Sequence, residues 1–295
     1  MPLAELVRLL CLSALWGASF LFMRIVSPDL GPAWTTESRV LLAGLALLGW
    51  QMASAAPPDW PKWRQHWRAL MLIGIFNTAL PFALLAFAAL TLPVGYLAIL
   101  NATAPMFGTL IGLVWLKESL TRRKLGAAVL GVMGVALVVR LGPVEPGPAV
   151  LLACAASVVA AMSYGWAANY LKRLAGSVPL GKMVAGTQLA AALAVVPLLP
   201  WMPVRAVPGW TSVGAALGLA LGCTALAYVI YFRLVRTIGP TRTLTVTLLV
   251  PMFALLWGAL FLDEVITGRM ALGCFVVLVA TWLFVSGQEA PRKSP

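Results

Sequence analysis

Charged residues are scarce in this chain of 295 residues. Asp, Glu, Lys and Arg together make up 10% of the positions, whereas hydrophobic residues make up 61%. An ordinary soluble domain is about one quarter charged and about half apolar, and it needs polar side chains to cover its surface. The composition therefore excludes a soluble globular domain and predicts an integral membrane protein.

Histidine and cysteine, which often build catalytic or metal centres, are also rare. The single histidine, His66, lies in the basic stretch WRQHWR and is expected at the surface. The four cysteines fall within apolar runs and show no close-spaced pattern, which is typical of packing residues. These residues cannot supply a familiar catalytic set or a group of metal ligands. We therefore predict that the protein is not an enzyme and carries no cofactor, metal or disulfide framework.

Acidic residues are outnumbered by basic ones, nine against 21, which gives a net charge of +12. Basic residues on one face would suggest nucleic-acid binding, but here they punctuate the ends of apolar runs. In membrane proteins such residues collect in cytoplasmic loops. With the N-terminus inside, the loop residues that fall outside are Arg140, Arg205 and Arg269. The distribution predicts that both termini are cytoplasmic and that nucleic acid is not a partner.

Long apolar runs, by contrast, fill the chain. A membrane-spanning helix needs about 20 mostly apolar residues, and charged, Pro-rich or Gly-rich breaks divide the sequence into ten such runs. The predicted helices lie near 5–26, 33–53, 69–90, 93–116, 122–140, 148–171, 180–200, 211–235, 240–262 and 269–286. The predicted fold class is an all-α integral membrane protein with ten transmembrane helices.

Two stretches of the sequence are near copies of each other. Residues 105–123 read PMFGTLIGLVWLKESLTRR, and residues 251–269 read PMFALLWGALFLDEVITGR. They close the fourth and ninth predicted helices, which indicates two five-helix repeats. Because five is odd, the second repeat enters the membrane from the opposite side, so the repeats are inverted. The expected domains are a first repeat at 1–142, an inverted second repeat at 148–286 and a cytoplasmic tail at 287–295.

Pro105 and Pro251 fall inside the predicted membrane helices, where proline removes a backbone hydrogen bond and bends the helix. Because the proline recurs in both copies, we interpret the pair as kinks that free carbonyls toward a polar cavity. The alternative is a pair of ordinary membrane prolines whose freed carbonyls are satisfied by neighbouring helices.

Three ionisable residues, Arg24, Glu37 and Arg39, lie within apolar runs. Such residues are candidates for function by default. Arg39 is two residues from Glu37 and therefore on a different helix face, so we expect Glu37 to pair with Arg24 of the neighbouring helix. A substrate carboxylate or ammonium site is the alternative. An ion pair would make Glu37 hard to protonate, which predicts export without obligatory proton or sodium coupling.

Deep aromatic and amide residues supply the candidate substrate cavity. Buried Tyr and Trp need hydrogen-bond partners and can stack on a planar ligand, although packing between helices explains any one of them equally well. The candidate cavity residues are Trp16, Asn77, Asn101, Tyr164, Trp166, Asn169 and Tyr228. They offer stacking faces and neutral hydrogen bonds, which favours compact and partly apolar substrates.

A Pro–Gly–Glu–Gly pattern closes the fourth and ninth predicted helices. It is formed by Pro105, Gly112, Glu118 and Gly126, and again by Pro251, Gly258, Glu264 and Gly273. With the Trp16–Gly17 pair and Arg39, this pattern resembles the EamA domain of the drug/metabolite transporter superfamily over nearly the whole chain, and is most similar to the aromatic amino acid exporter type. The resemblance implies a pathway between the halves, with the fifth and tenth helices peripheral. Each glutamate precedes a helix and is expected to stabilise the N-terminus of that helix.

Together these features predict a small-molecule exporter that works by alternating access in a bacterial inner membrane. The expected substrates are amino acids, aromatic or otherwise apolar, and related metabolites or toxicants. An exporter of other metabolites or cationic drugs is the main alternative, and an intramembrane enzyme is a distant one. The expected partners are the substrate and the lipid bilayer, and the sequence defines no oligomeric state.

Overall fold

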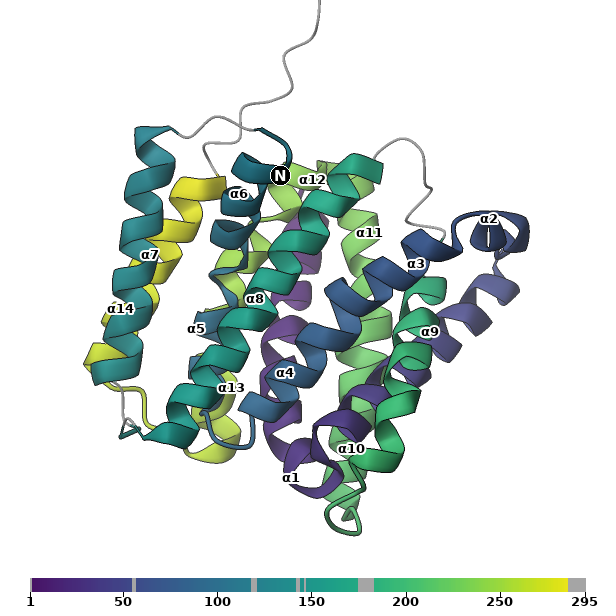
Figure 1. The fold of residues 1–295 in the computed structure, drawn as a ribbon, viewed down its shortest axis with the longest axis horizontal. Coiled ribbons are helices and arrows are strands. Elements are labelled where there is room, and N and C mark those ends of the chain that lie inside the picture. The colour runs from purple at the N-terminus through teal and green to yellow at the C-terminus, as the bar shows by residue number, and fades with distance from the viewer. Residues whose placement is uncertain are drawn as a thin grey trace, which may run out of the picture.

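The described part of the chain folds into a bundle of helices (Figure 1). The computed structural model describes residues 2–54, 57–117, 121–141, 144–145, 147–174 and 183–285. Within these ranges, six helical spans are long and apolar enough to cross a membrane: Leu3–Ala53, Trp67–Ala88, Val94–Trp115, Pro148–Leu174, Val184–Trp201 and Trp210–Ile238. Shorter apolar helices cover Val246–Leu262 and Gly268–Leu283. The protein is an integral membrane protein, as the composition predicts.

The first helix, α1 (Leu3–Ala53), consists of two legs. Its 51 residues would extend about 76 Å as a straight helix, far more than the bilayer core of about 30 Å. Gly31 has a φ of 74° and a ψ of 166°, which is outside the helical region and reverses the chain. Glycine tolerates a positive φ because it has no Cβ atom. The two legs correspond to the first and second predicted helices.

The remaining elements of the N-terminal half follow in order. They are α2 (Trp60–Gln65), α3 (Trp67–Gly74), the π-helix η1 (Ile75–Ala79), α4 (Leu80–Ala88), α5 (Val94–Asn101), α6 (Ala104–Trp115) and α7 (Arg122–Leu141). The segments α3, η1 and α4 form one continuous span, whereas the fourth predicted helix is divided into α5 and α6.

The C-terminal half begins with the long helix α8 (Pro148–Leu174). The later elements are α9 (Val184–Val195), the 3₁₀ segment η3 (Val196–Trp201), α10 (Trp210–Leu217), the π-helix η4 (Gly218–Leu226), α11 (Ala227–Ile238), α12 (Pro240–Thr243), α13 (Val246–Leu262) and α14 (Gly268–Val285). Helices α7 and α14 pack side by side at one end of the bundle, which is the peripheral position that the EamA resemblance implies (Figure 1).

Two features of the backbone recur in both halves. A π-helix interrupts the span that follows α2, and another interrupts the span that contains α10 and α11. The non-glycine residues with positive φ in the described ranges are Lys117 at 55° and Asp263 at 53°. Asp263 follows Lys117 by 146 positions, the same shift that relates Pro251 to Pro105. The duplicated sequence therefore adopts a duplicated local backbone geometry.

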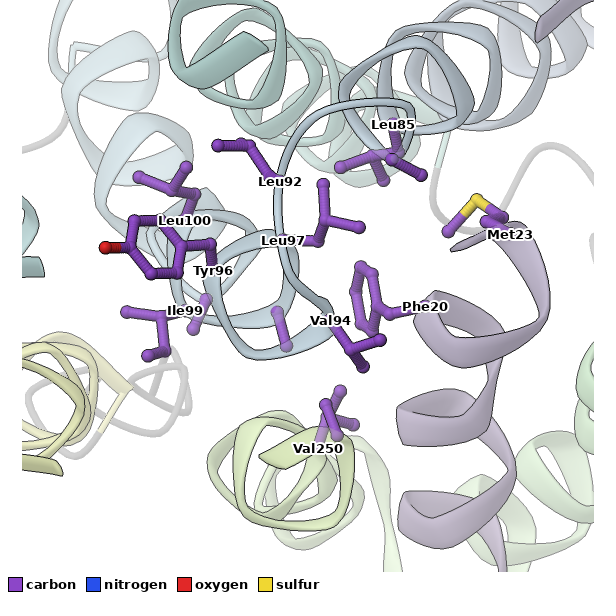
Figure 2. Packing of buried hydrophobic residues seen from close by; sticks show 14 of the residues in the cluster. Phe20, Met23, Leu85, Leu92, Val94, Tyr96, Leu97, Ile99, Leu100 and Val250 are labelled. Atoms are coloured by element: carbon purple, nitrogen blue, oxygen red, sulfur yellow. The ribbon is translucent and has the colours of Figure 1, made fainter. Parts of the chain in front are cut away.

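Helix α5 occupies the centre of the hydrophobic core. Every residue from Val94 to Leu100 is buried, as expected for a helix that is apolar on all sides. Figure 2 shows Phe20 of α1 and Leu85 of α4 near this helix, with Val250 of α13 below it. Side chains from both halves of the chain thus enclose α5.

The second copy of the duplicated motif positions the N-terminus of α5. The backbone N–H of Val94 donates to the Glu264 carboxylate, with its nitrogen 3.0 Å from each oxygen. A Cβ atom at Gly258 would lie 2.6 Å from Glu264 Oε2, so the motif glycine leaves room for the carboxylate. Glu264 therefore stabilises α5 in the other half, and the expectation that it serves the following helix α14 is wrong. Glu118 lies outside the described residues.

The change Glu264→Ala is expected to lower the stability of the protein by about 1–2 kcal/mol, because α5 loses a charged N-terminal cap. Thermal unfolding of the purified protein in detergent measures this effect. The control is Glu145→Ala, which removes an acid at an exposed position between α7 and α8. Equal melting temperatures for the two variants would show that the cap contributes little.

Candidate functional site

Arg39, on the second leg of α1, is the centre of a buried polar cluster. Its side chain is 5% exposed. Nε donates to Thr224 Oγ1 at 2.9 Å, and Nη2 lies 3.4 Å from Ser19 Oγ on the first leg. Nη1 lies 3.9 Å from Met23 Sδ, and the guanidinium carbon is 3.5 Å from the centroid of the Phe82 ring. Residues of α1, α4 and η4 therefore surround the cation.

Additional polar groups from other helices lie close to this cation. Tyr164 of α8 and Tyr228 of α11 lie near Arg39. Tyr228 also lies beside Thr78 of η1 and Gln188 of α9. Thr78 Oγ1 and both amide atoms of Gln188 are buried and lack a hydrogen-bond partner of good geometry. Thr78, Gln188 and Tyr228 thus form a buried polar group whose hydrogen-bonding capacity is only partly satisfied within the protein.

The two π-helices contribute matching residues to the cluster. Thr224 follows Thr78 by 146 positions, and Tyr228 follows Phe82 by the same shift. Thr78 belongs to η1 and Thr224 to η4. A π-helical turn changes the direction of its side chains and often marks a functional site. We define the Arg39 cluster as Ser19, Arg39, Thr78, Phe82, Tyr164, Gln188, Thr224 and Tyr228.

The predicted ion pair between Glu37 and Arg24 does not form. Arg24 Nη1 instead donates to the carbonyl oxygen of Ala89 at 2.6 Å. Ala89 follows the end of α4, where backbone carbonyls lose their helical partners and attract donors. Glu37 is 5% exposed, and its Oε2 has no hydrogen-bond partner. Uncoupled export, which was predicted from a Glu37 side chain paired with Arg24, therefore loses its structural support.

Trp166, predicted as a cavity residue, belongs to a separate group of aromatic rings. Its ring centroid lies 4.4 Å from that of Phe76, 5.5 Å from that of Trp115 and 5.2 Å from that of Tyr170. The guanidinium of Arg173 lies 5.1 Å from the Trp115 ring. These contacts connect α6, α8 and η1. At Trp166 the geometry is that of packing between helices, the alternative considered for every deep aromatic residue.

Asn169 of α8 connects this helix to α6 through its amide group. Nδ2 donates to the carbonyl oxygens of Gly108 at 2.6 Å and Gly165 at 2.9 Å.

The other predicted cavity residues lie in different places. Trp16 packs on another aromatic residue, since its ring lies 5.6 Å from that of Tyr231. Asn77 is half-buried on η1 beside Thr78, and Asn101 Oδ1 is buried without a partner at the end of α5. Of the seven predicted cavity residues, Tyr164 and Tyr228 lie at the Arg39 cluster.

The two prolines have different surroundings. Pro105 lies in the first turn of α6, just after the turn at Ala102 and Thr103 that separates α5 from α6. The hydroxyl of Thr281 on α14 donates to the Ala102 carbonyl at 2.9 Å, so a neighbouring helix satisfies this carbonyl. Pro251 lies inside α13, which continues through it. A cavity-side role for the two prolines stays a prediction.

Five members of the Arg39 cluster were not among the predicted site residues: Ser19, Thr78, Phe82, Gln188 and Thr224. Gln188 is an amide within the apolar run VAGTQLAAAL, a signal that was available in the sequence. Phe82 and Ser19 resemble many other core residues, and their importance follows from their contacts with Arg39.

The described residues form a helical membrane bundle with a buried polar centre between its halves, an arrangement that is found in membrane transporters. A model described as the EamA-like transporter family matches residues 5–140 and, a second time, residues 149–286, and the chain belongs to this family. The resemblance to the EamA domain is thereby confirmed. The aromatic amino acid exporter type stays a proposal.

Individual relatives support the same conclusion. The chain is 27% identical over 267 residues to the protein PecM of Dickeya dadantii, covering 90% of this chain and 86% of that protein. It is 28% identical over 287 residues to an uncharacterized transporter of Archaeoglobus fulgidus, covering 93% and 95%. It is 23% identical over 287 residues to the uncharacterized inner membrane transporter YedA of Escherichia coli K12, covering 95% and 90%.

A solved crystal structure shares the fold, with a TM-score of 0.64 at 17% identity over 96% of each chain. Family and relatives together identify a small-molecule membrane transporter.

Proposed function

We propose that the protein exports amino acids, aromatic or otherwise apolar, and related metabolites by alternating access. The observation that carries this proposal is the position of the Arg39 cluster between the two segments that match the family. Arg39 and Thr78 belong to residues 5–140, whereas Gln188 and Thr224 belong to residues 149–286. A solute bound there would contact both segments, so a rocking motion of one against the other would change the side from which it is accessible.

The duplicated features support two inverted five-helix repeats as the moving parts. The family model matches twice, and the π-helices and the left-handed residues Lys117 and Asp263 recur with the sequence repeat. An odd number of helices in each repeat would place the repeats in opposite orientations. The basic loop residues favour an inner-membrane protein with both termini in the cytoplasm.

The charge of the cluster argues against the main alternative. Arg39 would repel a cationic drug at the point where both halves meet, and the groups around it are hydroxyls, a thioether and aromatic rings. An electroneutral zwitterion or an anion is compatible with this surrounding. This observation favours amino acids over cationic toxicants.

Counterflow tests the proposed function. Proteoliposomes that contain the purified protein and a high internal concentration of unlabelled phenylalanine, methionine or leucine should transiently accumulate the same labelled amino acid from outside. The exchange requires a site that is alternately open to each side, which is why it distinguishes a transporter from a scaffold. Protein-free liposomes are the control. Absence of counterflow for all three amino acids would contradict the proposal.

A further inference from the structure

Arg39 carries a positive charge that no acid neutralises within the described part of the chain. The ion pairs formed there are Arg8–Glu5 and Lys62–Asp59. A guanidinium stays protonated in proteins, and a buried charge is costly unless it is paired. The hydroxyls of Thr224 and Ser19 and the face of Phe82 offset part of this cost. An anion in contact with Arg39 would offset more of it.

The donors of Arg39 with the weakest contacts are those at the end of the side chain. Of its five N–H groups, the one on Nε is directed to Thr224 at 2.9 Å. The two Nη atoms hold the other four, and their contacts are long: 3.9 Å to a sulfur and 3.4 Å to a hydroxyl. Two parallel N–H groups of a guanidinium match the two oxygens of a carboxylate.

We propose that Arg39 binds the carboxylate of the transported solute, which defines the substrate class as carboxylates and, in particular, zwitterionic amino acids. This inference rests on the proposed function and adds the anchoring group of the same site. The acceptor atoms for the ammonium group are Gln188 Oε1 and Thr78 Oγ1, both buried beside the Tyr228 hydroxyl and without a hydrogen-bond partner of good geometry. The rings of Tyr164 and Tyr228, which pack against apolar residues of the protein but are only partly buried, would contact the side chain of the solute.

Other anions fit the cluster less well. A phosphate ester brings up to two negative charges, whereas the side chains that contact Arg39 in the described residues are neutral. A single guanidinium with neutral neighbours matches the single charge of a carboxylate. The paired N–H groups of the planar guanidinium also distinguish a carboxylate, which has two oxygens, from a spherical ion such as chloride.

Binding to the full-length protein in lipid nanodiscs tests the proposal. The probes are phenylalanine, methionine and leucine, each compared with its amide, which keeps the ammonium group and side chain but lacks the carboxylate. Phenylpropanoate has the carboxylate and the aromatic ring but no ammonium group, so it tests binding of the carboxylate without the ammonium group. Sodium phosphate and sodium chloride test binding of inorganic anions. For the wild-type protein we expect at least one amino acid to bind about 10- to 100-fold more tightly than its amide. Phenylpropanoate should compete with that amino acid, and millimolar phosphate or chloride should not.

Variants separate anchoring from folding. Arg39→Gln should abolish the preference of the protein for the acid over the amide, whereas Arg39→Lys, which keeps the charge but loses the fork, should retain a reduced preference. The control is Arg24→Gln, which removes another arginine of α1 whose partner is a backbone carbonyl. This variant should keep the wild-type preference. The comparison of acid with amide in the wild-type protein needs no variant and stands if Arg39→Gln fails to fold.

Several results would overturn the proposal. They are failure of all three amino acids to bind, equal affinity of the wild-type protein for acid and amide, an unchanged preference in Arg39→Gln, and displacement by phosphate or chloride as effective as by phenylpropanoate. Counterflow of a solute without a carboxylate, together with any of these results, would reject Arg39 as the binding group for a substrate carboxylate. The same outcome would still show that the protein is a transporter. Failure of counterflow for every solute would reject the proposed function itself.

Discussion

Replacing Gly165 with alanine is expected to destabilise the protein strongly, whereas the same change at Gly108 should be tolerated. The two glycines face each other where α6 crosses α8. A Cβ atom at Gly165 would lie 2.5 Å from the backbone nitrogen of Gly108 and 2.8 Å from the carbonyl carbon of Phe107, so the helices would have to separate. A Cβ atom at Gly108 would lie 3.6 Å from Gly165 Cα, an ordinary contact.

The cost of Gly165→Ala is about 1–3 kcal/mol for overpacking alone. Separation of the helices also weakens the hydrogen bond that Asn169 donates to Gly108. Thermal unfolding of the two variants under identical conditions measures the difference, with size-exclusion chromatography to confirm that each remains monodisperse. Equal destabilisation by both changes would show that the crossing is looser than the structure indicates.

The second large effect is expected at Trp166. The change Trp166→Ala removes the ring that contacts Phe76, Trp115 and Tyr170, and should cost about 3–5 kcal/mol of stability. Trp166→Phe keeps an aromatic ring at this position and should cost much less. Melting temperature and amino acid affinity are measured together, because they separate packing from substrate contact. A variant with normal melting temperature and lost affinity would restore Trp166 to the substrate site.

Tyr228, an aromatic member of the Arg39 cluster, provides a comparison for the Trp166 test. Tyr228→Phe removes the hydroxyl beside Thr78 and Gln188 but keeps the ring. We expect it to change affinity more than melting temperature, the reverse of Trp166→Ala. Similar effects of the two variants on both quantities would show that the structure does not separate the aromatic residues into two groups.

The positions of the helical spans could be predicted from the sequence, because apolar runs and the breaks between them depend on local composition. The legs of α1 and the span Trp67–Ala88, for example, lie within a few residues of their predicted bounds. The duplicated motif also indicated that its two copies have a common role. It did not show that Glu264 reaches across to Val94, since that contact joins positions far apart in the chain.

The partner of Arg24 could not be predicted in the same way. Helix periodicity shows which face a residue occupies, but it does not give the distance between helices or the positions of backbone carbonyls. The carbonyl of Ala89 competes for Arg24 because α4 ends there, and no side-chain pattern records that competition. No partner was predicted for Arg39 either, and its contacts are hydroxyls, a thioether and a ring from segments far apart in the chain.

The bend at Gly31 has a consequence for biosynthesis. An isolated helix with arginine near its centre enters the bilayer at a cost of about 2.5–3.5 kcal/mol for that residue. Since α1 reverses at Gly31, Arg39 and its contacts Ser19 and Met23 belong to the same helical hairpin. The hairpin can leave the translocon as one unit, with the first leg already shielding the cation of the second, before η4 has been synthesised and Thr224 can accept its hydrogen bond.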